Sequence, residues 1–228
     1  MKHLALIMDG NRRWAKKQGL LSWRGHGKGV ETVKRVIEFC IQKKIPYLSL
    51  FTFSIENFRR SPEELSFLFD LLALEAESNL EQFVRNGVRI QFVGDRSLFP
   101  AGILGSIERL EKATQHLATL HVSLLFCYGG QQEIVNGIKN VVRKVQAGLL
   151  TEDQISEDLF KDYLWTSGTP EPDLIIRTGG HHRLSNFLLY QAAYSELYFL
   201  DCLWPELETF HLEKALDQFE LRQRNFGA

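Results

Sequence analysis

Residues 3–18, HLALIMDGNRRWAKKQ, pass from an apolar run through a glycine turn to a basic segment. The apolar run at 3–7 predicts a buried strand, and the basic segment at 16–18 predicts the first turns of a helix. In α/β sheets, ligands bind beyond the carboxyl ends of strands, where a strand stops and a helix begins. The turn at 9–11 therefore predicts an α/β fold with a binding site at the end of its first strand.

The residues of this turn favour an anionic ligand. Gly10 lets the backbone approach a ligand closely, and the N–H groups of the following helix start attract an anion. Arg12 and Arg13 add positive charge suited to phosphate oxygens. Asp9 would repel such an anion unless a hard divalent cation, most plausibly Mg²⁺, lies between them. Spacing alone favours the simpler interpretation, an Asp-Gly turn before a solvated basic helix.

Composition describes an ordinary soluble protein. The 228 residues are 44% hydrophobic and 24% charged, which predicts a single domain spanning 1–228. A net charge of −1 argues against nucleic-acid binding through bulk charge. Cys40, Cys127 and Cys202 lack metal-ligand spacing and predict core positions in a reducing compartment. Without a membrane-spanning run or a signal peptide, we expect a cytoplasmic protein that could act on a lipid at a membrane surface.

Strands and helices alternate along the chain. Further strands are predicted at 47–53, 88–93, 120–126, 173–176 and 197–199. A helix is predicted after the segment 25–27 and ends by Pro46, and further helices are predicted at 61–87, 100–118, 130–145, 151–164 and 208–224. This alternation predicts a mostly parallel central sheet flanked by helices. The strand at 88–93 alternates apolar with polar residues, so we expect it nearer an edge.

The helix predicted at 61–87 has an unusual apolar surface. Ser61, Pro62 and Glu64 form a helix start, with Glu64 placed as the capping-box partner of Ser61. Apolar residues then cover nearly the whole circumference: Leu65, Phe67, Leu68, Phe69, Leu71, Leu72 and Leu74. A helix that is apolar all round must bury both faces. One face can meet the sheet, and the other requires a second subunit or an apolar ligand.

Three polar loops follow predicted strands, at 9–14, 54–60 and 177–186. In a parallel sheet these loops converge on one crevice. The crevice would then gather five arginines: Arg12, Arg13, Arg60, Arg177 and Arg183. Guanidinium groups match phosphate oxygens bidentately, so five of them predict a site for more than one phosphate group. Taken singly, each arginine could equally form a surface ion pair.

Motifs at these loops carry a family resemblance. They are M-D-G-N-x-R-W at 8–14, G-H at 25–26, F-S-x-E-N-x-x-R at 53–60, Y-G-G at 128–130, R-T-G-G-x-x-R-x-S-N-F at 177–187 and A-Y-x-E-L-x-F at 193–199. With these motifs the chain resembles the cis-prenyltransferases, in particular the bacterial undecaprenyl diphosphate synthases. The resemblance implies a homodimer with a hydrophobic tunnel between sheet and helices. It also implies Mg²⁺-dependent condensation of isopentenyl diphosphate onto an allylic diphosphate, usually farnesyl diphosphate.

The resemblance also implies roles for individual residues. Asp9 would be the catalytic carboxylate that handles Mg²⁺, His26 would assist diphosphate departure, and Asn57 would be the proton acceptor. Glu196 would contribute to the Mg²⁺ site. Substrate-binding positions would be Gly10, Asn11, Arg12, Arg13, Trp14, Ser54, Ile55, Glu56, Phe58, Arg60, Arg177, Arg183, Leu184 and Ser185. Because a neutral amide is a poor base, we expect Asn57 to orient a substrate or water while diphosphate takes the proton.

Other interpretations remain open at this point. Glu64 could serve only as a cap, and His26 could be an ordinary residue at a helix start. His26, His181 and His182 lack the spacing of a zinc site. A non-catalytic, prenyl-lipid-binding partner subunit on the same fold would be expected to lose Asp9, which is present. A nucleotide-binding enzyme is disfavoured because the chain has no G-x-x-x-x-G-K-[ST] motif, and a trans-prenyltransferase because it has no D-D-x-x-D motif.

Overall fold

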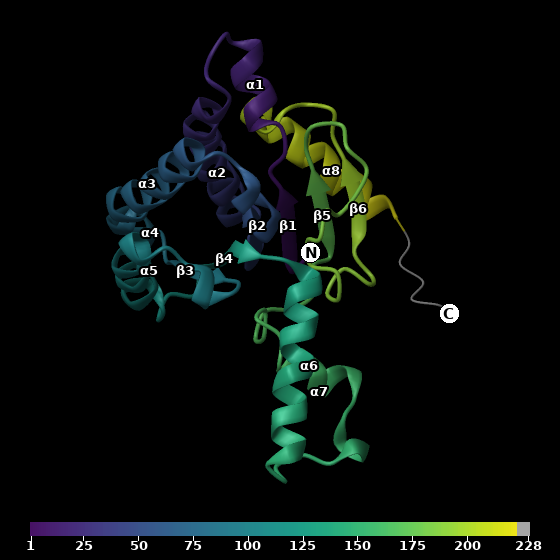
Figure 1. Ribbon diagram of the computed structural model, residues 1–228. Helices are drawn as coiled ribbons and strands as arrows, with labels where there is room; N and C mark the ends of the chain where they lie inside the picture. Colours follow the sequence, from purple (N-terminus) through teal and green to yellow (C-terminus); the bar gives the residue numbers. More distant parts are fainter. Residues whose placement is uncertain (223–228) are drawn as a thin grey trace.

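The computed structural model describes residues 1–222 and contains one six-stranded sheet (Figure 1). Its strands are β1 (His3–Ile7), β2 (Tyr47–Ser54), β3 (Val88–Val93), β4 (Leu120–Tyr128), β5 (Leu174–Arg177) and β6 (Glu196–Phe199). The strand order is β3-β4-β2-β1-β5-β6, and each of the five pairings among the described residues is parallel. The α/β prediction is confirmed, and β3 lies at an edge as its alternating sequence indicated.

The position of β1 explains why the site forms where it does. Leu4 of β1 lies opposite Leu48 of β2 on one side and Leu174 of β5 on the other. β1 therefore lies inside the sheet, with β2, β4 and β3 on one side and β5 and β6 on the other. Loops that leave β1 and its two neighbours surround a crevice at their carboxyl ends.

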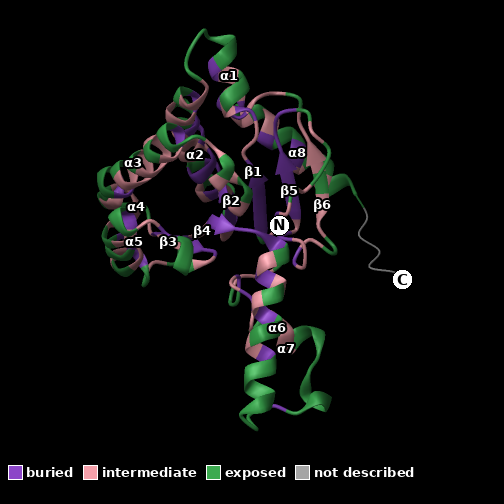
Figure 2. Cartoon of the chain, viewed as in Figure 1, coloured by how far each residue is buried: buried purple, intermediate pink, exposed green. Residues whose placement is uncertain are grey.

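Helices cover the two faces of the sheet unequally. They are α1 (Asn11–Lys17), α2 (Gly25–Gln42), α3 (Pro62–Ser78), α4 (Leu80–Arg85), α5 (Ala101–Thr114), α6 (Gly130–Gln146), α7 (Glu157–Lys161) and α8 (Thr209–Leu221). The main core lies between one face of the sheet and helices α2, α3, α5 and α8. A smaller core covers the other face, where Phe187 and Leu188 pack near the start of α6. Figures 1 and 2 show α6 and α7 extending away from the sheet, with mostly exposed surfaces.

Several helix predictions are wrong in extent. The basic residues at 16–17 form the last turn of α1, which begins directly after Gly10, and α2 begins at Gly25, inside the segment expected to precede it. The helix predicted at 61–87 is interrupted at Asn79, whose side-chain Nδ2 donates to the Glu75 carbonyl oxygen at 2.7 Å. The helix predicted at 151–164 is instead a single turn, Glu152–Gln154, followed by the five-residue α7. There Ser156 Oγ accepts from Leu159 N–H and so starts a separate short helix. The predicted terminal helix ends at Leu221 in α8, and Arg224 lies outside the described residues.

The three cysteines were expected to occupy core positions. Cys40 and Cys127 are buried and Cys202 is partly buried, all three as free thiols. Burial raises the pKa of Cys40 and Cys127 to about 12, so both thiols are protonated at neutral pH. Among residues 1–222, no helix has the length and apolar character that crossing a bilayer requires.

Candidate active site

The three predicted polar loops meet at the carboxyl edge of the sheet. Asp9 follows β1, Ser54 ends β2 and Arg177 ends β5. Next to them lies a polar cleft of about 350 Å³. Its lining residues are Met8, Asp9, Gly10, Asn11, Arg12, Arg13, Lys16, His26 and Arg60. The convergence predicted from the parallel sheet is therefore confirmed.

An apolar cavity of about 300 Å³ adjoins the polar cleft. Its apolar walls are Val30, Val33, Phe51, Phe53, Leu68, Leu71, Leu72, Phe126 and Trp204. Asp9, Asn11, His26 and Arg60 line both the cavity and the cleft. Leu68, Leu71 and Leu72 of α3 line this cavity, whereas Leu74 on the same helix is 61% exposed. The expectation that α3 buries its whole apolar circumference is therefore wrong, although part of its surface meets a cavity.

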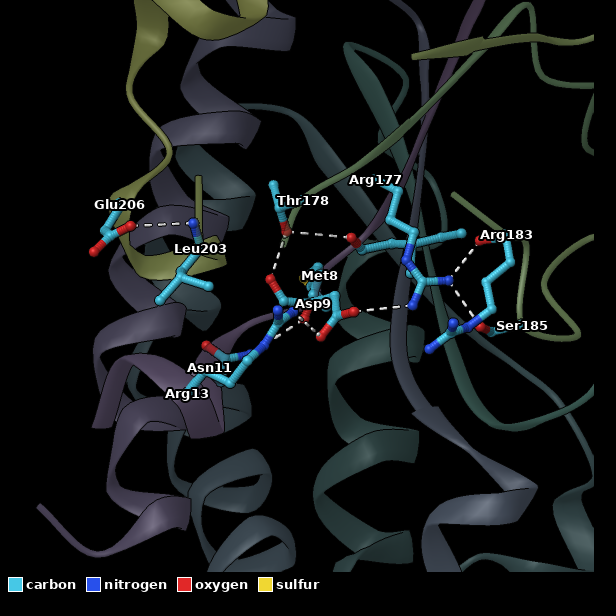
Figure 3. Close-up of polar contacts among 11 residues, drawn as sticks. Met8, Asp9, Asn11, Arg13, Arg177, Thr178, Arg183, Ser185, Leu203 and Glu206 are labelled. Carbon is cyan, nitrogen blue, oxygen red and sulfur yellow. Dashed lines mark hydrogen bonds and ion pairs between the residues drawn. The ribbon is translucent and has the colours of Figure 1, made fainter. Parts of the chain in front are cut away.

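Two arginines hold the Asp9 carboxylate (Figure 3). Arg177 Nη2 donates to Asp9 Oδ2 at 2.9 Å, and Arg13 Nη2 lies 3.1 Å from Asp9 Oδ1. The Arg177 side chain is only 5% exposed, so this ion pair is shielded from water, whereas Arg13 reaches in from the surface. Thr178 Oγ1 donates to the Asp9 carbonyl oxygen at 2.7 Å and fixes the backbone. The carboxylate is thereby held where Asp9 lines both the cavity and the cleft.

Two glycines allow the backbone to pack this closely. Gly10 has φ of 117°, and a Cβ there would lie 2.9 Å from Leu203. A glycine is therefore required at position 10 for close packing against another loop, in addition to the close approach of a ligand expected from the sequence. A Cβ on Gly179, which has φ of 86°, would lie 2.3 Å from Arg13 Nη2 and displace this arginine.

A buried acid lies among the basic groups of the cleft. Glu64 is 3% exposed, and its Oε1 lies 3.3 Å from Arg60 Nη1, 3.7 Å from Arg12 Nε and 4.0 Å from His26 Nε2. Its backbone N–H donates to Ser61 Oγ, so Ser61 is the expected N-cap. The Glu64 carboxylate, which was expected to complete a capping box, instead contacts two arginines that line the cleft. Burial, followed by the charges of Arg60 and Arg12, lowers the pKa of His26 to about 3. His26 is therefore a neutral imidazole at physiological pH.

Polar groups also line the entrance of the apolar cavity. Ser54, Asn57, Arg177 and Ser185 all contribute to its wall. Asn57 Oδ1 accepts from the backbone N–H of Ser54 at 3.1 Å, which leaves its amide NH₂ available to other groups. Arg177 Nη1 donates to Ser185 Oγ at 2.7 Å. These bonds fix side chains from the loops after β2 and β5 in the wall of the cavity.

Several residues expected in the site lie outside its walls. The residues that line neither the cleft nor the cavity are Trp14, Ile55, Glu56, Phe58, Arg183, Leu184 and Glu196. Phe58 packs edge-on against Phe53 with ring centroids 5.0 Å apart, and Arg183 offers its carbonyl oxygen to Arg177 while its side chain is exposed. Trp14 and Ile55 are partly buried, and Leu184 packs beside the smaller core. Four of the five predicted arginines therefore line the two spaces.

Glu196 lies at the other end of the sheet. It pairs with Leu174 at the start of β6, and Leu174 pairs with Leu4, five positions before Asp9. The Glu196 carboxylate forms an ion pair with Arg222. Within one chain, Asp9 and Glu196 are not brought together, because a residue that begins a parallel strand lies opposite the carboxyl edge.

Three site residues were missed from the sequence. Lys16 lines the polar cleft, Glu64 supplies its buried acid, and Asn186 links loops around the entrance. The spacing of Arg60 and Glu64, four residues apart at a helix start, is a signal that could have suggested their contact. Asn186 carried no such local signal, because its partners are distant in sequence.

Comparison with known proteins agrees with this geometry. The family model described as putative undecaprenyl diphosphate synthase matches residues 7–227. The chain belongs to this family of prenyltransferases. It is 42% identical over 226 residues to the farnesyl-diphosphate-specific ditrans,polycis-undecaprenyl-diphosphate synthase of Pseudomonas aeruginosa, covering 99% of this chain and 90% of that protein.

Two further similar proteins are described with other allylic diphosphates. The geranylgeranyl-diphosphate-specific tritrans,polycis-undecaprenyl-diphosphate synthase of Thermoplasma acidophilum is 40% identical over 228 residues, covering 99% of this chain and 88% of that protein. The crystal structure of lavandulyl diphosphate synthase from Lavandula x intermedia, in complex with dimethylallyl diphosphate, is 34% identical with a TM-score of 0.95. The match covers 100% of this chain and 98% of that one. The family thus combines one fold with allylic diphosphates of different length.

Proposed function

We propose that this protein is a Mg²⁺-dependent cis-prenyltransferase that adds isopentenyl diphosphate units to an allylic diphosphate, with farnesyl diphosphate as the primer. The product would be a long-chain polyprenyl diphosphate such as undecaprenyl diphosphate, a lipid-carrier precursor for cell-wall synthesis. One observation carries the proposal. The polar cleft and the apolar cavity share Asp9, Asn11, His26 and Arg60, so charged and hydrocarbon parts of one substrate would meet at this wall.

The chemical step matches these two environments. Ionisation of an allylic diphosphate leaves negative charge on the departing oxygens and positive charge on carbon. Arg12, Arg13 and Arg60 lie where they could stabilise the departing diphosphate. The apolar cavity would keep water from the carbocation. Because His26 is neutral, its imidazole could accept or donate a hydrogen bond to the diphosphate without repelling the neighbouring arginines.

The second substrate has a separate set of groups. Arg177 and Ser185 line the cavity entrance, and Arg183 lies in the same loop, which suits the diphosphate of isopentenyl diphosphate. Asn57, from the loop after β2, lines the same cavity with its side-chain carbonyl oxygen already bonded to Ser54 N–H. We therefore assign Asn57 an orienting role, with diphosphate as the proton acceptor.

The donor set of the polar cleft fits Mg²⁺. This ion is commonly held by one or two carboxylates together with substrate phosphate oxygens and water. Asp9 would supply the carboxylate, and its partners Arg13 and Arg177 would then contact the diphosphates. When bound, the ion would neutralise charge on the departing diphosphate. Residues 1–222 contain no group of three His, Cys, Asp or Glu residues suited to a metal, so the substrate would complete the site.

The protein would function as a homodimer in the cytoplasm, with peripheral membrane contact for product release and no nucleic-acid partner. An exposed apolar stripe on α6 supports the homodimer. It contains Val135, Ile138, Val142 and Val145, each 40–50% exposed, and continues to Leu149. Spacings of three and four residues place these side chains along one helix face, which suits pairing with an identical helix.

Purified protein should convert farnesyl diphosphate and radiolabelled isopentenyl diphosphate to long-chain products when Mg²⁺ is present. EDTA should abolish turnover, and Asp9→Ala should lower kcat by about 100-fold or more, because the metal and its carboxylate stabilise the leaving group. Product chromatography measures both effects, with the exposed Asp217→Ala as the matched control. Parallel reactions with geranyl and geranylgeranyl diphosphate identify the preferred primer.

Two outcomes would contradict the proposal. Turnover that is unaffected by EDTA and by Asp9→Ala would remove the metal-and-carboxylate mechanism. Binding of polyprenyl lipid without any turnover would favour the alternative, a non-catalytic partner subunit. The presence of Asp9 and Arg177 in an intact ion pair supports the catalytic reading over this alternative.

A further inference from the structure

The loop after β5 has an unusual backbone conformation. Ser185, Asn186 and Leu188 have φ values of 52°, 67° and 42°, in the left-handed region that favours glycine. Such a conformation costs on the order of 1 kcal/mol or more per residue and persists only where the surroundings impose it. Phe187 and Leu188 are buried, at 0% and 1% exposure, and anchor one end of this segment.

Asn186 bonds this loop to two others. Its carbonyl oxygen accepts from Gly130 N–H at 2.7 Å, and its side-chain Oδ1 accepts from Gln131 N–H at 2.8 Å. Its Nδ2 donates to Glu56 Oε1 at 2.8 Å and to Gln132 Oε1 at 3.0 Å. One side chain therefore joins the loop after β5 to the start of α6 and to the loop after β2.

The bond between Asn186 and Glu56 joins two loops whose neighbouring residues line the apolar cavity. Glu56 directly precedes Asn57, and Asn186 directly follows Ser185. Asn57 and Ser185 both line the cavity, whereas Glu56 and Asn186 do not. The Asn186–Glu56 bond thus lies one residue along the chain from a cavity-lining residue in each loop.

The surroundings of Glu56 are suited to this contact. Partial burial raises the pKa of Glu56. Hydrogen bonds from backbone N–H and from the side chains of Asn186 and Ser54 lower this pKa by more, so the net shift is downward. Glu56 is therefore an ionised acceptor at neutral pH. Glu56 itself is exposed, so its bond to Asn186 does not help to bury the core.

We propose that Asn186 is a positioning residue that, through its hydrogen bond to Glu56, fixes the loop carrying Asn57 relative to the loop carrying Ser185 and Arg183. This inference rests on the proposed function, since these loops hold the reacting ends of the two substrates there. Misplacement of bound substrates by about 1 Å can lower a rate by about 100-fold. Asn186 thereby acts on the reaction without touching a substrate.

The decisive variant is Asn186→Asp, because aspartate tolerates the same backbone conformation but cannot donate to Glu56. Two carboxylates at this distance repel each other and bind a shared proton more tightly than either does alone. We expect kcat with farnesyl and isopentenyl diphosphates to fall about 10-fold or more at pH 8. Relative to the wild type at the same pH, this deficit should shrink towards pH 6 as the shared proton restores a hydrogen bond.

A second substitution tests the partner directly. Glu56→Gln alone should stay within about 3-fold of wild type, because its amide oxygen still accepts from Asn186. Added to Asn186→Asp, it should bring kcat back to within about 3-fold of wild type and abolish the pH-dependent recovery, because the glutamine amide donates to Asp. Asn86→Asp, at the exposed end of α4, is the matched control and should leave kcat unchanged.

Each outcome has a defined reading once kcat is normalised to active sites and melting temperatures are recorded. An active wild type with Asn186→Asp within 3-fold of it at pH 8 would overturn the inference. A deficit that neither low pH nor Glu56→Gln relieves would also overturn it, and would indicate a purely structural role. A wild type without turnover on these substrates would overturn the proposed function and, with it, this inference.

Discussion

His3 is buried and His26 is partly buried, and they lie at different ends of the sheet. His26 lies in the polar cleft, where burial and two arginines keep it neutral. His3 lies at the amino end of β1, where its Nδ1 is 2.6 Å from the Pro170 carbonyl oxygen and its Nε2 is 2.9 Å from Ser49 Oγ. Burial lowers the pKa of His3 to about 4 despite the contact with Pro170.

The low pKa of His3 predicts a loss of stability in acid. The unfolded chain takes up this proton below about pH 6.5, whereas the folded protein takes it up only below about pH 4. The free energy of unfolding should therefore decrease as pH falls from 6.5 towards 4, by about 3 kcal/mol from this residue. Urea unfolding at pH 7 and pH 4.5 measures the effect.

His3→Gln is the variant that isolates this contribution, because glutamine does not titrate. It should be less stable than wild type at pH 7, yet lose less stability on acidification. His26 supplies a similar pH dependence in both proteins and cancels in the comparison. Equal losses for wild type and His3→Gln would show that His3 does not titrate between these pH values.

The positions of some site residues could be predicted from the amino-acid sequence, and those of others could not. Asp9 and Arg177 were predictable because each ends a parallel strand, and all such ends share one edge. The contacts of Glu64 with Arg12 and of Asn186 with Glu56 were not, because they depend on packing between segments far apart in the chain. The motif that contains Glu196 suggested a metal ligand, but the β5–β6 register places this residue opposite Leu174.

At the scale of elements, α6 differs from the helices that cover the sheet. Its lower half is exposed in Figure 2, and its apolar stripe faces away from the core among the described residues. The neighbouring segment at 152–162 contains acidic residues, and α6 itself carries Lys139, Arg143 and Lys144. A second copy could therefore meet this helix with both apolar and opposite-charge contacts.

Val142→Asp should weaken the proposed homodimer, because it places a carboxylate in the middle of the apolar stripe. Val142 is 46% exposed, so the monomer should keep its melting temperature within a few degrees. Sedimentation velocity across a concentration series measures the dissociation constant, which should rise about 10-fold or more. Val84→Asp on α4 is the matched control, since Val84 is 42% exposed and lies outside the stripe. An unchanged dissociation constant for Val142→Asp would exclude α6 as the interface.

Predictions of whole elements succeeded where the apolar pattern is long and failed where local hydrogen bonds intervene. The six strands and their parallel pairing follow from apolar runs that alternate with helices. Ser156 and Asn79 interrupt predicted helices because their side chains bond to nearby backbone groups. These bonds compete with helix continuation over only a few residues, which a hydrophobic pattern does not register.

At the scale of the whole molecule, two helices define the depth of the apolar cavity. Along α2, His26 lies in the polar cleft, and Val30 and Val33 follow in the cavity wall. The rise of 1.5 Å per residue puts Val33 about 10 Å beyond His26. Along α3, Leu68 and Leu72 follow Glu64 in the same direction, so the cavity extends inward from the site between these helices.

This geometry predicts that a larger side chain at Val33 shortens the product. Val33→Phe would fill part of the 300 Å³ cavity at its inner region without touching the polar cleft. The first condensation should therefore keep its rate within about 3-fold, while later condensations stop earlier because the growing chain meets the new ring. Chromatographic sizing of products made from farnesyl and isopentenyl diphosphates measures the shift, and Val84→Phe on exposed α4 is the control. If Val33→Phe and wild type give the same product length, the growing chain does not occupy this cavity.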